Sequence, residues 1–260
     1  LDPCGLSNRM LVNPFCTSDI IIDISGFASG DKFSWRTEAS RWQMFRLAKL
    51  AGNKIIFMPQ SWGPFSHPLS RFFTKKIIAD ADVVFAREKK SYEYLKSLEG
   101  IDLNKIFSSP DIAFQFRGGL PEDGHRVLQR AGLAAKNCPL IGITPNMQIY
   151  KRTTGVGPGN GYFKLLTEVI RYFLQATNAM IVLIPHEFSW FRKNDPELCQ
   201  ELKSVFPDDS RVISLAGTET AKEVKSVIGL LDFLVASRYH SLIAALSLRI
   251  PVVVIGWAHK

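Results

Sequence analysis

The segment of residues 237–260 constrains the fold most, because a polar turn, a helix and a buried strand follow one another closely in it. A short apolar strand precedes it at residues 230–236, and a second begins after Pro251. Ser237 is the expected N-cap of the helix between the two strands. This order is the repeating unit of a doubly wound parallel sheet, in which ligands bind at the carboxyl ends of strands and at helix N-termini.

Two residues at that helix start, Arg238 and His240, suit the chemistry of an anionic substrate. An arginine fork and free helix N–H groups bind phosphate or carboxylate, and a histidine two residues later can transfer a proton to the bound group. A plainer interpretation fits the same pattern, in which Arg238 pairs with a nearby carboxylate and His240 is a surface histidine. The short R-x-H pattern alone leaves both interpretations open.

Apolar runs and amphipathic stretches alternate along the chain, as they do in parallel α/β proteins. We expect strands at residues 20–24, 54–58, 82–86, 140–144, 180–185, 211–214, 231–236 and 252–255. Helix-length amphipathic stretches lie between most of them, such as 35–51, 163–177, 197–206 and 221–228. The stretch 118–122 is the best linker, and a helix over 121–134 then opens the second domain. The predicted α/β domains are therefore residues 1–117 and 118–260.

Several segments, in order along the chain, match motifs of one family. The end of the chain, with its R-x-H, small-residue helix, proline-initiated strand and Lys260, resembles the C-terminal signature of the polysaccharide pyruvyl transferase family. Residues 57–65 resemble its strand-end PQS-x-GP element, residues 81–95 its strand followed by R-E-x-x-S-x-x-x-L, and residues 109–114 its D-x-A-F segment. The opening strand matches loosely, since Ser25 and Gly26 stand where the family commonly has two glycines.

The resemblance implies a GT-B-like architecture of two Rossmann-like domains facing a cleft, with the sugar acceptor on the first domain and the donor on the second. It also implies an activity in polysaccharide synthesis. The enolpyruvyl group of phosphoenolpyruvate would be attached to two hydroxyls of one sugar as a cyclic ketal, with no metal and no cofactor. Whether the acceptor is linked to a lipid stays open.

The site residues follow from joining the resemblance to the chemistry of each side chain. His240 is the expected catalytic residue for proton transfer. On the donor side we expect Arg238, Lys260, Arg152 and His186. On the acceptor side, or in the cleft wall, we expect Gln60, Ser61 and Arg87.

Two of these donor-side positions have weaker support from the residues themselves. Residues 145–161 follow a strand and carry Lys151, Arg152 and four glycines, which predicts a mobile loop able to fold over a phosphorylated ligand. The segment has neither a P-loop nor a dinucleotide fingerprint, and a solvated surface loop is the alternative. His186 follows the strand at 180–185, where a structural histidine and a ligand-binding histidine fit equally well.

Composition excludes some classes of protein. With 46% apolar and 22% charged residues, and no apolar run near the roughly 18 residues of a membrane span, the sequence predicts a soluble, cytoplasmic protein. The net charge of +8 favours anionic substrates or peripheral contact with an anionic membrane surface. The basic residues are scattered along the chain, which argues against binding of nucleic acid.

The four cysteines lack metal-ligand spacing, which predicts reduced thiols and no metal site. A first residue other than Met, and an end at the signature lysine, lead us to expect truncation at both ends.

Two other functions stay open. A GT-B glycosyltransferase that uses a nucleotide sugar shares the architecture, with Asp111 as a candidate base, but no clear acidic residue for the ribose stands near Arg238. A non-catalytic, sugar-binding remnant of the fold would also fit a truncated chain, although Arg238 and His240 are both present.

Overall fold

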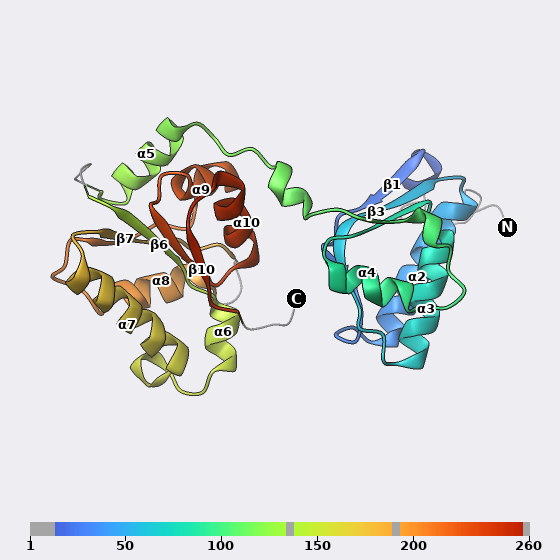
Figure 1. The fold of residues 1–260 in the computed structure, drawn as a ribbon, viewed down its shortest axis with the longest axis horizontal. Helices are drawn as coiled ribbons and strands as arrows, with labels where there is room; N and C mark the ends of the chain where they lie inside the picture. The colour runs from blue at the N-terminus through green and yellow to red at the C-terminus, as the bar shows by residue number, and fades with distance from the viewer. Residues whose placement is uncertain (1–13, 134–137, 189–192, 257–260) are drawn as a thin grey trace. The chain divides into compact units, whose positions relative to one another are not determined.

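In the part of the chain that the structure describes, parallel strands joined by helices build two five-stranded sheets (Figure 1). The computed structural model describes residues 14–133, 138–188 and 193–256. They divide into two units, one ending at Ile112 and the other beginning at Ala113. The boundary predicted after residue 117 lies a few residues beyond this division. No helix within the described ranges has the length and hydropathy of a membrane span.

The sheet of the first unit has the order β1, β3, β4, β5, and β2 pairs with the distal part of β3. Its strands are β1 (Ile20–Asp23), β2 (Phe27–Ser29), β3 (Lys54–Trp62), β4 (Val83–Ala86) and β5 (Ile106–Ser108). Its helices are α2 (Trp35–Leu50), α3 (Pro68–Asp80), α4 (Lys89–Lys96) and the 3-10 turn η2 (Leu103–Lys105). Rings of Phe45, Phe57 and Trp62, in edge-on contact at 4.8 and 5.5 Å, form the centre of the core.

Strand β3 runs to Trp62, so the prediction of a strand ending at Met58 followed by a turn is wrong. The Trp62 indole N–H donates to the Phe85 carbonyl at 3.0 Å, and its backbone N–H donates to the Ser91 hydroxyl at 2.7 Å. Both contacts hold the end of β3 against β4 and α4. As a result, Gln60 and Ser61 lie inside a strand end rather than in a loop.

The second unit has the sheet order β10, β9, β6, β7, β8. Its strands are β6 (Leu140–Thr144), β7 (Met180–Leu183), β8 (Val212–Ser214), β9 (Phe233–Ala236) and β10 (Val252–Val254). Its helices are α5 (Pro121–Arg130), α6 (Met147–Arg152), α7 (Gly161–Ala176), α8 (Asp195–Lys203), α9 (Ala221–Ile228) and α10 (Tyr239–Leu248), with the 3-10 turn η4 (Gly157–Gly159). The 3-10 turn η3 (Ile112–Gln115) begins at the last residue of the first unit. Counted from β8, the strands follow the order 3-2-1-4-5 of a Rossmann sheet.

Both faces of this second sheet are covered by helices. Ile181 and Leu183 of β7 face a cluster that includes α7 and α8, whereas Met180 and Val182 face a cluster that includes α5, α9 and α10. A parallel strand buried on both faces must be apolar at successive positions, which explains why these strands were recognisable in the sequence. The predicted α/β class with two Rossmann-like units is confirmed.

Three local predictions are wrong. Helix α10 has Arg238 rather than Ser237 as its N-cap. Residues 145–161 are largely helical and do not form an open loop. The buried side chain of Asn160 stabilises the segment by donating to three backbone carbonyls, those of Tyr150, Thr153 and Gly155. Cys16 is disulfide-bonded, whereas Cys138 and Cys199 are the free thiols that we expected.

Candidate functional site

The point where the strand order of the second sheet reverses lies between β6 and β9. These two strands are neighbours, and in open α/β sheets the carboxyl ends at such a point form the ligand-binding crevice. Asn146, which follows β6, donates from its side chain to the Ser237 carbonyl at 2.8 Å. The Tyr162 hydroxyl donates to the Ser237 hydroxyl at 2.7 Å and accepts from the Asn146 N–H. These bonds fix the chain that leads into α10.

The guanidinium of Arg238 forms ion pairs with two carboxylates. Its Nη2 lies 2.5 Å from the Asp195 carboxylate and its Nη1 lies 2.6 Å from the Glu187 carboxylate. Asp195 is fully buried, whereas the Glu187 side chain is 44% exposed. The carboxylate pairing that the sequence left open is therefore present, and only the Glu187 half of it faces solvent.

Asp195, the first residue of α8, connects three segments of the second unit. Its Oδ1 accepts the Met147 N–H at 2.9 Å, and its Oδ2 accepts the N–H groups of His186 and Glu187 at 3.3 and 3.0 Å. With Arg238 as a fourth partner, one carboxylate joins the chain after β6, the chain after β7 and the start of α10. Sequence reasoning missed Asp195, because no local pattern links it to Arg238.

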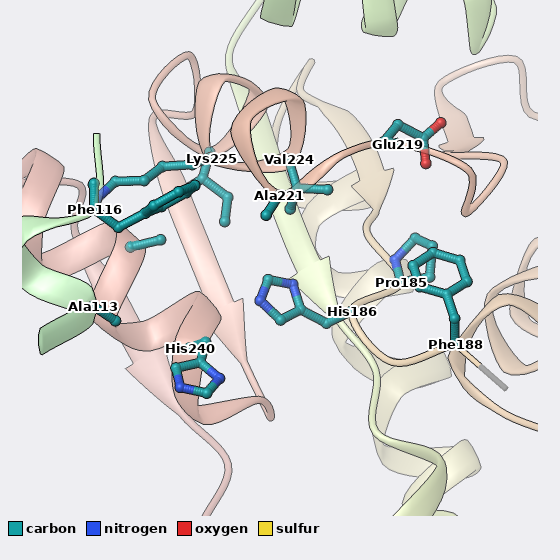
Figure 2. A pocket seen from close by; sticks show the side chains of 12 residues that line it. Ala113, Phe116, Pro185, His186, Phe188, Glu219, Ala221, Val224, Lys225 and His240 are labelled. Atoms are coloured by element: carbon teal, nitrogen blue, oxygen red, sulfur yellow. The ribbon is translucent and has the colours of Figure 1, made fainter. Parts of the chain in front are cut away.

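A cavity of about 440 Å³ opens beside this network, and all of its lining residues belong to the second unit. The side chains of His186 and His240 both reach it, one from the end of β7 and the other from the first turn of α10 (Figure 2). His240 is exposed. The two histidines that the sequence singled out separately are thus brought to one site.

The protonation of His186 is set by its surroundings. Burial, and then the charges of His240 and Arg238, lower its pKa to about 4. Its Nδ1 is buried, and none of the described residues offers that atom a hydrogen-bond partner. At neutral pH the ring is therefore neutral.

Acidification is expected to destabilise the protein through His186. The pKa of about 4 in the folded state lies below the roughly 6.5 of an unfolded chain, so the unfolded state takes up the proton first. The free energy of unfolding should thus fall as the pH drops from about 6.5 to about 4, by up to about 3 kcal/mol. Chemical denaturation of the wild type and His186→Gln across this range measures the effect. Parallel profiles for the two proteins would contradict it.

The rest of the cavity is mainly apolar. Phe116, Phe188, Ala221 and Val224 contribute to its walls. Lys225 is almost fully buried there, donates to the Phe116 carbonyl and lies 5.8 Å from the centre of the Phe116 ring. Burial lowers the pKa of this lysine. Lys225 is a second residue that the sequence did not single out, since it occupies an ordinary helical position.

The remaining predicted donor residues lie elsewhere. Arg152 is exposed at the end of α6 and is not among the residues that line the cavity. Lys260 lies outside the described residues. Across the described ranges, no group of three or more His, Cys, Asp and Glu side chains is arranged to hold a metal ion.

In the first unit, Gln60, Ser61 and Arg87 meet at the carboxyl ends of β3 and β4. The Arg87 Nε donates to the Ser61 hydroxyl at 2.9 Å, and its Nη1 lies 2.8 Å from the Asp111 carboxylate. Gln60 is paired in register with Ala86, and its buried amide has no hydrogen-bond partner among the described residues. Asp111 is thus already engaged by Arg87, which weakens its candidacy as a glycosyltransferase base.

Several solved structures share this fold. A glycosyltransferase from Rickettsia africae is 14% identical, with 96% of this chain and 62% of that chain covered and a TM-score of 0.56. S. aureus MnaA with UDP is 12% identical (95% and 62% covered, TM-score 0.55), and Anabaena Alr3699/HepE with UDP-glucose is 13% identical (95% and 62% covered, TM-score 0.52). This chain therefore spans about three-fifths of the length of these proteins. Among curated proteins, no relative matches.

The family model described as polysaccharide pyruvyl transferase matches residues 7–259, nearly the whole chain. The matched range includes the R-x-H of α10, the PQS strand end of β3 and the R-E pair after β4, which are the segments that carried the resemblance in the sequence. The chain belongs to the polysaccharide pyruvyl transferase family.

Proposed function

We propose that the protein transfers the enolpyruvyl group of phosphoenolpyruvate onto two hydroxyls of one sugar, forming a pyruvate ketal and releasing phosphate. The observation that carries this proposal is the convergence of His186 and His240 on one cavity beside Arg238, at the strand-order reversal of the second sheet. The donor has two anionic groups, and its reaction requires proton transfer to carbon. The site offers a guanidinium and two imidazoles for these tasks.

Arg238 is proposed to release the Glu187 carboxylate and to bind an anionic group of the donor in its place. The exposed Glu187 would leave the guanidinium, while the buried Asp195 stays and keeps it in place. A charge-assisted, two-point contact to phosphate or carboxylate would replace the lost pair. His186, neutral and with a buried nitrogen to spare, is proposed as a further donor contact.

His240 is proposed to act as the acid and then as the base. Protonated His240 gives its proton to the methylene carbon of phosphoenolpyruvate, which becomes a methyl group and leaves a cation at the central carbon. A sugar hydroxyl attacks that carbon and returns its proton to His240. The second hydroxyl then displaces the phosphate, which takes up that hydroxyl's proton, so atoms and charges balance without a metal. Gln60, Ser61 and Arg87 are proposed to serve the sugar acceptor.

One observation favours a second candidate, a glycosyltransferase that uses a nucleotide sugar. Phosphoenolpyruvate is small and carries two anionic groups, yet much of the cavity wall is apolar and includes the rings of Phe116 and Phe188. Such a wall suits the flat face of a nucleobase. MnaA and HepE, which share the fold, were solved with UDP and UDP-glucose.

Thermal unfolding with each donor separates the two candidates. Phosphoenolpyruvate at about 100 times its Kd should stabilise the protein by about 2.7 kcal/mol, which raises the melting temperature by a few degrees. UDP-glucose at the same concentration should have a much smaller effect, and inorganic phosphate serves as the control for a simple anion. The reverse order of shifts would favour the nucleotide-sugar reaction. Release of phosphate from phosphoenolpyruvate with a panel of hexosides then tests turnover.

A further inference from the structure

Helix α3 exposes large apolar side chains that its own core does not need. Leu69 and Phe72 are 44% and 49% exposed, and they share one face of the helix with the exposed Lys76. The opposite side of the helix packs Ile77 and Ile78 into the core of the first unit. Leu69 and Phe72 therefore belong to a surface, and not to incomplete packing of the core.

Aromatic rings extend this surface from α3 to the start of α2. The Phe72 and Phe73 rings lie 5.2 Å apart, and the Phe73 ring stacks on the Trp35 ring at 6.4 Å with an angle of 12° between the planes. Trp35 is partly exposed. The two helices thus present a continuous group of rings, anchored in the fold by Phe73.

Cationic groups lie directly over these rings. The Arg36 guanidinium is 4.7 Å from the centre of the Trp35 ring, and the Lys76 ammonium is 5.5 Å from the centre of the Phe72 ring. Lys75 adds a third basic group next to Lys76. Helix α3 has no acidic residue before its last position, Asp80, which pairs with Arg46. The surface is therefore aromatic and cationic together.

We propose that this aromatic–basic patch, made of Trp35, Arg36, Leu69, Phe72, Lys75 and Lys76, docks on an anionic lipid bilayer. Rings and aliphatic side chains of this kind partition into the headgroup region, where the adjoining cations meet the negative surface charge. An isolated exposed leucine or phenylalanine would need no explanation. The coincidence of apolar tips with a cluster of cations selects an anionic bilayer as the occupant. The proposal is independent of the donor and of the reaction.

Co-sedimentation with vesicles tests the proposal on the full chain. We expect binding to phosphatidylcholine vesicles that contain phosphatidylglycerol, little binding to pure phosphatidylcholine, and weaker binding at high salt. The double variant Lys75→Gln/Lys76→Gln should lower the partition coefficient roughly 30-fold, and Phe72→Ser roughly tenfold.

Matched changes on the second unit serve as controls. Lys164→Gln/Lys203→Gln removes the same charge from exposed positions, and Leu165→Ser removes a leucine that is 47% exposed. These variants should bind the anionic vesicles like the wild type, and circular dichroism should show that all the variants are folded. The proposal is overturned by an absence of binding to the anionic vesicles, by equal binding to both kinds of vesicle, or by equal losses in the patch and control variants.

Discussion

Replacing Asp195 by alanine is expected to lower the free energy of unfolding by about 3–5 kcal/mol. The substitution removes a fully buried carboxylate from a pair with Arg238, and breaking a buried ion pair by deleting one partner leaves an uncompensated charge. It also deprives the backbone N–H groups of Met147, His186 and Glu187 of their acceptor. Denaturant unfolding, monitored by far-ultraviolet circular dichroism, measures the loss.

Glu187→Ala is the matched control, because Glu187 pairs with the same guanidinium from an exposed position. An exposed ion pair contributes little, so this variant should lose no more than about 1 kcal/mol. Similar losses in the two variants would contradict a special role for Asp195. The contrast between the two variants also tests the proposed donor site. That site requires the Asp195 carboxylate to stay paired with Arg238 and the Glu187 carboxylate to be exchangeable.

The sequence predicted well those features that depend on neighbours along the chain. The apolar strands around Ile143 and Val235 are buried on both faces, so their composition alone identified them. The short strands β2 and β5, three residues each, carry too little pattern to be recognised. Helix α3 was missed as well, since exposed Leu69 and Phe72 blur the periodicity that identifies a helix.

The candidate site was only half predictable, for a related reason. Arg238, His240 and His186 stand at strand ends, and the α/β pattern locates such ends. Asp195 is far from Arg238 in the sequence, and the contact arises only when the chains after β7 and β9 come together. The prediction of a mobile cationic loop at 145–161 was wrong for the same reason. The Asn160 side chain donates hydrogen bonds to three backbone carbonyls of this segment, and no sequence motif indicates these bonds.

Replacing His240 by alanine is expected to lower kcat by roughly 10²–10⁴-fold, with little change in donor affinity. His240 is exposed on the first turn of α10, so its removal should leave the fold intact. The comparison variant is Arg238→Lys rather than Arg238→Ala, because alanine would leave Asp195 buried without its partner. Lysine keeps the charge but loses the fork, so we expect the KM for the donor to rise roughly 30-fold, which corresponds to about 2 kcal/mol, with a smaller change in kcat.

The decisive measurement is the division of the two effects between kcat and KM, obtained from steady-state kinetics and from the donor Kd of each variant. A proton-transfer residue acts mainly in the transition state, whereas an anion-binding residue acts on the bound donor as well. If the whole loss in His240→Ala appears in the donor Kd, His240 is a binding residue and the proton must come from another group. His186, the other histidine that lines the cavity, would then be replaced to test whether the bound donor raises its pKa from about 4 far enough for it to supply the proton.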